Sequence, residues 1–106
     1  MKKYYIYQTT NLINGKIYVG VHGSENIEKD KYIGSGRTFL KAVKKYGRDA
    51  FVREILYEFD NDTEAYNLEH ELVDEDFVER RDTYNMCKVI SMKIYLNLLE
   101  FYCLHK

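Results

Sequence analysis

The sequence contains no proline among its 106 residues and only two cysteines, Cys87 and Cys103. Two cysteines are too few for a disulfide scaffold, and no closely spaced pair is present to hold a structural zinc ion, so buried thiols are expected. The N-terminus lacks the long apolar core of an export signal, which favours a cytoplasmic protein. Together with the length, these absences predict a single disulfide-free domain.

A strong net charge is also missing. Sixteen basic and seventeen acidic side chains give a net charge of -1, which argues against a uniformly basic DNA-coating protein. The charges are nevertheless segregated, because residues 1–53 hold eleven basic and four acidic side chains, whereas residues 54–86 hold two and twelve. This asymmetry is typical of a protein with one face toward a polyanion, although a solvated acidic helix beside a solvated basic one gives the same pattern.

Tyrosine, by contrast, is abundant. Its eleven copies suit half-buried strand positions and binding clefts, because the ring packs while the hydroxyl stays available. Residues 4–10 and 16–21 have the β-branched and aromatic composition of strands, and Asn14-Gly15 between them favours a tight turn with positive φ. The two strands are predicted to form an antiparallel hairpin that brings Tyr7 close to Tyr18. Residues 22–32 are polar and are expected to form a loop.

Further elements follow along the chain. A helix is expected from an N-cap at Ser35 to Gly47, and a second helix is expected after a cap at Asp62 or Thr63. The first has an apolar stripe of Phe39, Leu40 and Val43, and the second has one of Ala65, Leu68, Leu72 and Val73. Residues 51–59 are predicted to form a third strand, with Phe51, Arg53, Ile55, Tyr57 and Phe59 on one side. After a charged turn over residues 79–82, residues 84–86 are expected to be extended.

These elements predict a small α/β domain of the α+β type over residues 1–86, in which a three-stranded, mainly antiparallel sheet is flanked by helices. Residues 87–106 are rich in apolar side chains, yet they are too short and too polar to span a bilayer. We expect them to form a helical tail that packs on the domain or on a partner, including a second copy of the chain. No membrane association is expected.

Two tripeptides then become informative together. Tyr5-Ile6-Tyr7 and Tyr18-Val19-Gly20, on two strands of one hairpin, resemble the paired motif of the GIY-YIG nuclease superfamily. The segments Lys44-Lys45-Tyr46-Gly47, 51–56, 65–73 and Tyr84-Asn85 are similar, in this order, to the phage-encoded homing endonucleases of that superfamily. The resemblance covers about residues 4–86 and implies a metal-dependent endonuclease that hydrolyses phosphodiester bonds in double-stranded DNA.

The resemblance also implies roles for four residues. Tyr7 and Tyr18 would hold or deprotonate the attacking water, a task that needs a phenol of lowered pKa. Glu69, on the edge of an apolar helical stripe, would be a single ligand for Mg²⁺, which keeps most of its waters. Asn85 would orient the site. Each residue also has a purely structural interpretation: cross-strand packing for the tyrosines, a turn in which Asn85 bonds to its own backbone, and an exposed helical carboxylate for Glu69. For Glu71 we prefer the exposed carboxylate.

The sequence departs from the family pattern at two places. Tyr5 replaces the first glycine, and residues 21–34 contain no arginine where the family has an essential one. His22, if protonated, is the first candidate for the missing cation, and Arg37 at a helix N-terminus is the second. Tyr32-Ile33-Gly34 copies the motif but lacks the hairpin, so we interpret it as a decoy.

The first predicted helix is a natural surface for the DNA backbone. Its basic side chains are Arg37, Lys41, Lys44, Lys45 and Arg48. The chain is not expected to carry a separate module that reads the target site, so specificity comes from elsewhere or the copy is shortened. Two hypotheses therefore stand: an active endonuclease, located in the host cytoplasm if phage-encoded, and a catalytically inactive DNA-binding remnant of the same fold.

Overall fold

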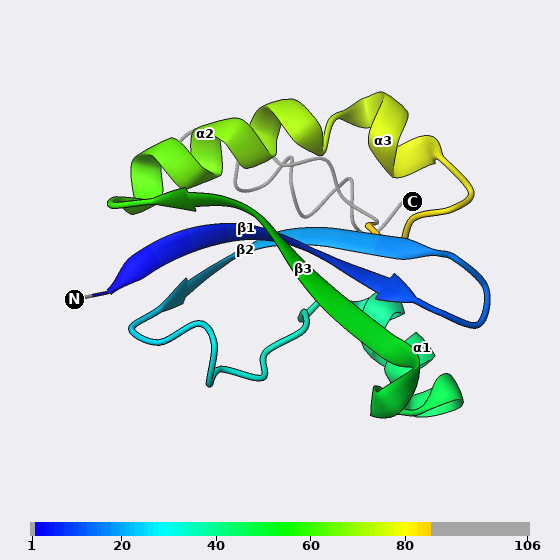
Figure 1. Cartoon of the computed structure of the whole chain (residues 1–106). Coiled ribbons are helices and arrows are strands. Elements are labelled where there is room, and N and C mark those ends of the chain that lie inside the picture. Colours follow the sequence, from blue (N-terminus) through cyan, green and yellow to red (C-terminus); the bar gives the residue numbers. More distant parts are fainter. Residues whose placement is uncertain (1, 86–106) are drawn as a thin grey trace.

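The computed structural model describes residues 2–85. Strands β1 (Lys3–Asn11), β2 (Ile17–Ser24) and β3 (Phe51–Phe59) form an antiparallel sheet in the order β2-β1-β3. The helices are α1 (Arg37–Tyr46), the short 3-10 helix η1 (Arg48–Ala50), α2 (Asp62–Leu72) and α3 (Glu75–Glu79) (Figure 1). The predicted fold class is confirmed, whereas the predicted tail over 87–106 lies outside the described residues.

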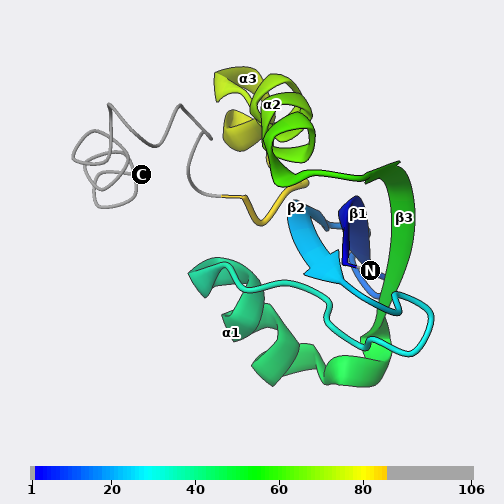
Figure 2. The same cartoon turned by 90° about the vertical axis from the view of Figure 1, so that its left-hand side faces the viewer.

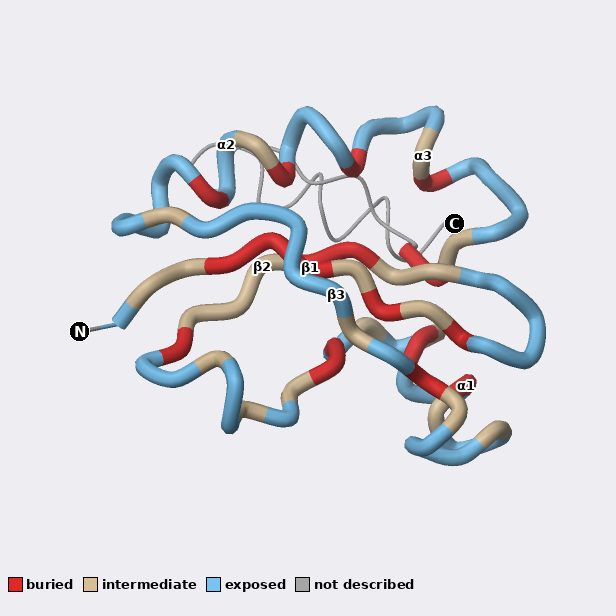
Figure 3. Tube along the Cα trace, viewed as in Figure 1, coloured by how far each residue is buried: buried red, intermediate tan, exposed pale blue. Residues whose placement is uncertain are grey.

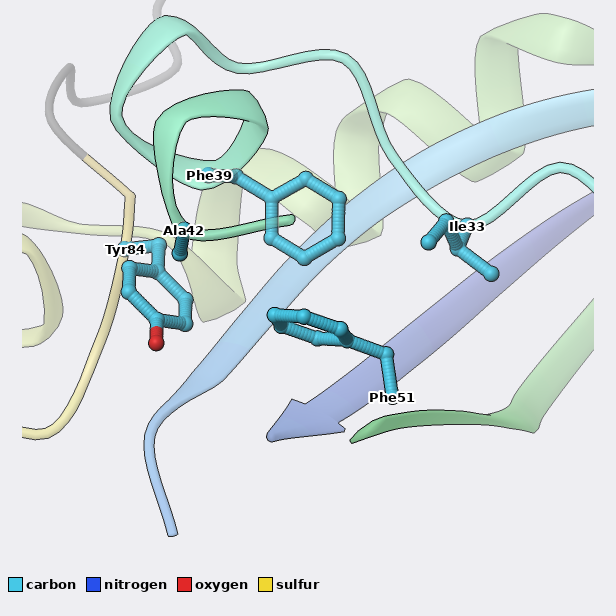
Figure 4. Packing of buried hydrophobic residues seen from close by; sticks show 5 residues of the cluster. All are labelled: Ile33, Phe39, Ala42, Phe51 and Tyr84. Carbon is cyan, nitrogen blue, oxygen red and sulfur yellow. The ribbon is translucent and has the colours of Figure 1, made fainter. Parts of the chain in front are cut away.

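The sheet separates two layers of helix, with α1 on one face and with α2 and α3 on the other (Figure 2). On the α1 side, Ile33, Phe39, Ala42, Phe51 and Tyr84 form one buried cluster (Figure 4). On the other side, Ile6, Val19, Val73 and Val78 form a second buried cluster. Side chains alternate across a strand, so Ile6 faces α2 and Tyr7 faces α1. None of the helices within residues 2–85 is long and apolar enough to cross a membrane.

The hairpin between β1 and β2 is confirmed. Gly15 alone in it takes positive φ, at 77°, and Asn14 does not. The loop is closed by the backbone N–H of Asn11, which donates to the Lys16 carbonyl over 2.8 Å. The Asn11 side chain accepts from the Ile13 N–H over 2.9 Å. Residues 12–16 therefore form a five-residue connection with an Asx turn, and β2 continues to Ser24 rather than ending at residue 21.

Strand β3 departs from the predicted alternation. Tyr7 pairs with Ile55 and Ile6 pairs with Tyr57, so Leu56 is an extra residue, a β-bulge. The bulge places Tyr57 and Phe59 on the α2 side, whereas Phe51, Arg53 and Ile55 remain on the α1 side. The prediction that all five share one side is therefore wrong. Burial along the trace is high in β1 and low over most of β3 (Figure 3).

Helix α1 begins one residue later than the predicted cap implies, and α2 begins at least one residue earlier. Gly36, not Ser35, is the N-cap of α1, and Asn61 caps α2 by accepting from the Glu64 N–H. Leu40 is 49% exposed, so Ala42 replaces it in the buried stripe of α1 beside Phe39. In α2, the expected burial of Ala65 and Val73 is confirmed, but Leu72 is exposed. Helix α3 was not foreseen at all.

Candidate active site

The two hairpin tyrosines lie together on the α1 side of the sheet, as predicted. The ring centroids of Tyr7 and Tyr18 are 6.3 Å apart. Tyr7 lies opposite Gly20 in the register, and a Cβ atom at Gly20 would come within 2.7 Å of the Tyr7 hydroxyl. The glycine of the second tripeptide thus makes room for the tyrosine of the first.

The phenols are not activated in the way the sequence suggested. Tyr7 is only 1% exposed, and burial is the main cause that raises its pKa far above the ordinary value. Burial also raises the pKa of Tyr18, although hydrogen bonds from the Ser35 side chain and the Gly36 backbone oppose the rise. Tyr18 stacks on Phe39 with centroids 4.8 Å apart. The expectation of lowered pKa values is wrong, because apolar surroundings penalise a phenolate.

Tyr32 lies outside the hairpin, as predicted for the decoy tripeptide, yet its ring belongs to the same aromatic cluster. Its ring meets that of Tyr7 edge-on, with centroids 5.9 Å apart and an interplanar angle of 85°. It also stacks on His22, with centroids 4.0 Å apart and an angle of 11°. The loop after β2 carries Tyr32 back to the hairpin. Spacing along the sequence holds no signal for this return, so the sequence interpretation missed it.

His22 lies on the same face as the tyrosines and is held by a carboxylate. Its Nε2 is 2.7 Å from Oδ2 of Asp30. The Tyr32 backbone N–H donates to the other Asp30 oxygen, and this bond, followed by the one to His22, lowers the pKa of Asp30 to about 2. Asp30 is therefore an anion at any physiological pH. His22 lies on β2 and not in the expected loop, and its ring is paired with a carboxylate.

Arg53 on β3 fixes the loop that carries these groups. Its guanidinium donates to the Tyr32 carbonyl and to the Ile27 carbonyl, each over 2.8 Å. The same side chain lies 3.9 Å from Asp30. Asp30 and Arg53 were both missed by the sequence interpretation, which treated residues 22–32 as an irregular loop and Arg53 as one member of a strand face.

The outer edge of β2 organises the remaining two candidates. Ile17, Val19 and Val21 direct their backbone groups away from β1, since alternate residues of an edge strand do so. Ile17 bonds to the backbone of Asp82 and Tyr84. Val19 bonds to the Asn85 side chain, whose Oδ1 accepts from the Val19 N–H over 2.9 Å and whose Nδ2 donates to the Val19 carbonyl over 2.7 Å.

Glu69 completes this edge from α2. Its carboxylate accepts a hydrogen bond from the Val21 N–H. The residue is 9% exposed, and burial raises its pKa to about 7, with the Val21 bond opposing the rise. After burial, the Glu69 charge is among the smaller causes that raise the pKa values of Tyr7 and Tyr18. Glu71, two residues further, is exposed.

Glu69 is not part of a cluster of metal-ligating side chains in the described residues. Within residues 2–85, no three His, Cys, Asp or Glu side chains gather as a ready-made metal site. A single buried carboxylate fits Mg²⁺, which is commonly bound by one or two carboxylates and completes its shell with water and substrate oxygens. A cation there would also offset the desolvation that raises the pKa of Glu69.

The residues predicted to contact DNA lie in the α1 layer, on the opposite face of the sheet from α2 (Figure 2). Lys41, Lys44, Lys45 and Arg48 are exposed on α1 and η1, and Arg37 is the exposed first residue of α1. Arg48 also donates to the Lys31 carbonyl over 2.6 Å. The structure therefore brings Tyr7, Tyr18 and His22 together, sets Glu69 and Asn85 on the adjoining strand edge, and leaves the basic residues on the surface.

Comparison with known proteins gives related sequences from one phage. The chain is 54% identical over 83 residues to "Putative endonuclease segD" and 43% identical over 83 residues to "Putative endonuclease segE", both from Enterobacteria phage T4. It is 43% identical over 86 residues to "Endonuclease segA" of the same phage. These matches cover 78% to 80% of this chain but only 37% to 40% of the relatives' length. No family model and no solved structure gives a significant match.

Proposed function

We propose that this chain is the catalytic unit of a metal-dependent DNA endonuclease of the GIY-YIG type. The observation that carries the proposal is the buried Glu69 carboxylate bonded to Val21 on β2, the strand that also carries Tyr18. Relatives that are named endonucleases support a nucleic-acid substrate, and their phage origin supports action in the host cytoplasm. Double-stranded DNA is the proposed substrate.

In this proposal the phenols act as neutral groups. Burial keeps Tyr7 and Tyr18 protonated, so in this proposal they contribute hydrogen bonds to the site and do not remove a proton from the attacking water. Glu69 would hold Mg²⁺, which supplies charge neutralisation at the phosphate and activation of water when bound. Asn85 fixes the β2 edge through Val19, so that the strand carrying Tyr18 keeps its position relative to Glu69.

Two cations are available for the phosphate. His22 lies inside the aromatic cluster, but it is paired with the Asp30 carboxylate, which would repel a phosphate. Arg37 begins α1, directly after Gly36, where an added Cβ atom would come within 2.8 Å of the Tyr18 ring. The N-terminus of α1 thus adjoins the tyrosine site, and the basic residues along α1 extend from it. We place the DNA backbone along this surface, with phosphate contacts that position the duplex.

The alternative function is a DNA-binding remnant without activity. The missing arginine in residues 21–34 and the raised phenol pKa values both favour it. It predicts the same DNA surface but no cleavage, so a cleavage assay separates the two.

Supercoiled plasmid incubated with the protein and Mg²⁺ tests the proposal. The wild type should produce nicked or linear DNA, and EDTA should stop it. Glu69→Gln, which can still accept from the Val21 N–H, should reduce the rate by about a hundredfold or more, because the metal loses its charged ligand. Glu71→Gln is the matched control on the same helix and should cleave normally. A wild type that binds plasmid without cleaving it would establish the remnant instead.

A further inference from the structure

Tyr32 is fixed more firmly than its place in a surface loop requires. It is only partly buried and belongs to neither of the two buried clusters described above. Its backbone N–H donates to Asp30 over 2.8 Å, and its carbonyl accepts from Arg53 over 2.8 Å. The next carbonyl, that of Ile33, accepts from the Thr9 hydroxyl over 2.6 Å.

The ring of Tyr32 is fixed as well. One face stacks on His22, whose own orientation is set by Asp30, and Tyr7 meets it edge-on. A side chain whose backbone and ring are held from several elements is preorganised, which is the property that a functional group needs. Asp30, Arg53 and His22 are the positioning residues of this arrangement.

The three phenols of the cluster differ in access. Tyr7 is 1% exposed and lies behind Gly20, whereas Tyr32 is only partly buried. After burial, a hydrogen bond with Tyr32 is among the smaller causes that raise the pKa of Tyr7, so the two hydroxyl groups interact. The Tyr18 oxygen, by contrast, is already engaged by Ser35 and Gly36.

We propose that Tyr32 is a third catalytic tyrosine, whose hydroxyl donates a hydrogen bond to a non-bridging oxygen of the scissile phosphate. The buried ring of Tyr7 meets the ring of Tyr32 edge-on and supports its position. This inference rests on the proposed function and deepens it. It also supplies a donor at a site where the sequence lacks the expected arginine, since any preorganised donor stabilises charge that develops on the phosphate.

The test is the single-turnover cleavage rate of Tyr32→Phe, with saturating protein and Mg²⁺. Phenylalanine keeps the ring that stacks on His22 and removes only the hydroxyl. We expect the rate to fall by about tenfold or more, with DNA affinity by fluorescence anisotropy and the thermal midpoint unchanged. Tyr57→Phe, on the opposite side of the sheet, is the control and should match the wild type.

The outcomes are separable. A Tyr32→Phe rate within about threefold of the wild type would overturn the inference and leave the proposed function intact. A loss of rate that only parallels a loss of stability or affinity would overturn it too, because Tyr32 would then be structural. A wild type that does not cleave at all would overturn the proposed function, and the catalytic role of Tyr32 with it.

Discussion

At the scale of single residues, the buried position of Glu69 lowers the stability of the folded protein when the carboxylate is charged. Its folded-state pKa is raised to about 7 from an ordinary 4.5, so the folded protein favours the protonated acid. The contribution of this group to the free energy of unfolding is therefore greatest below pH 4.5 and is lost as the pH rises through about 7. A charged carboxylate that is kept buried at higher pH is typical of a site built for a cation.

Glu69→Gln should therefore stabilise the metal-free protein at pH 8 by about 2 to 3 kcal/mol, and it should have little effect at pH 4. Urea unfolding in EDTA at the two pH values measures this. Mg²⁺ should reduce the difference in free energy of unfolding between Glu69→Gln and the wild type at pH 8, because it binds the charged wild-type side chain and not the amide. Glu71→Gln, at an exposed position, should show neither effect. A constant offset between Glu69→Gln and wild type at both pH values would contradict the raised pKa.

At the scale of elements, α1 carries two different tasks on two sides. Phe39 and Ala42 pack against the sheet, and the lysines of the opposite side remain in solvent. Its N-terminus adjoins Tyr18 through Gly36, so the same helix connects the proposed DNA surface with the site. The helix thus aligns the duplex with the chemistry if its lysines follow the backbone.

Charge reversal of Lys41, Lys44 and Lys45 to Glu should weaken binding to two unrelated DNA duplexes equally. It should also reduce the slope of log K for DNA binding against log salt concentration by up to about 3, because each lost phosphate contact reduces the slope by roughly 0.9. Anisotropy titrations over a range of salt concentrations measure both. Arg81→Glu, beyond α3 on the other side of the sheet, should leave the slope unchanged. An unchanged slope in the triple variant would move the DNA surface elsewhere, most simply to the hairpin loop.

At the scale of the whole molecule, residues 82–85 return to the first hairpin and tie the end of the described chain to its beginning. Tyr84 enters the cluster on the α1 side, and its hydroxyl accepts from Asn11 over 3.0 Å and from Asn14 over 3.2 Å. Asn85 then bonds to Val19 at both backbone groups. The contacts join residues more than 60 positions apart.

Asn85→Ala should lower the free energy of unfolding by about 2 to 3 kcal/mol, because it leaves two buried backbone groups of Val19 unpaired. Asn85→Asp keeps an acceptor for the Val19 N–H but opposes the Val19 carbonyl with a negative charge. Its stability should therefore improve at low pH, where a protonated carboxyl can donate. Urea unfolding and hydrogen exchange at the Val19 amide measure these effects. Unaltered exchange at Val19 in Asn85→Ala would show that another group protects this edge.

The sequence predicted what local patterns determine. The Asn14-Gly15 turn and the alternation of β1 and β2 suffice to place Tyr7 beside Tyr18, and the structure confirms that pair. The bulge at Leu56 has no local signature, so the side on which Tyr57 lies was wrong. The position of Tyr32 depends on the path of a loop that Arg53 ties down from another strand. The phenol pKa values depend on burial against Phe39 and other distant residues, which spacing cannot reveal.

The edge of β2 is closed by the Asn85 amide and the Glu69 carboxylate where a fourth strand could otherwise add. An uncovered edge of this kind is a template for pairing with another chain and hence for aggregation. The two side chains proposed for the site therefore also keep another chain from pairing with the β2 edge of the sheet. This protection does not depend on whether the protein cleaves DNA.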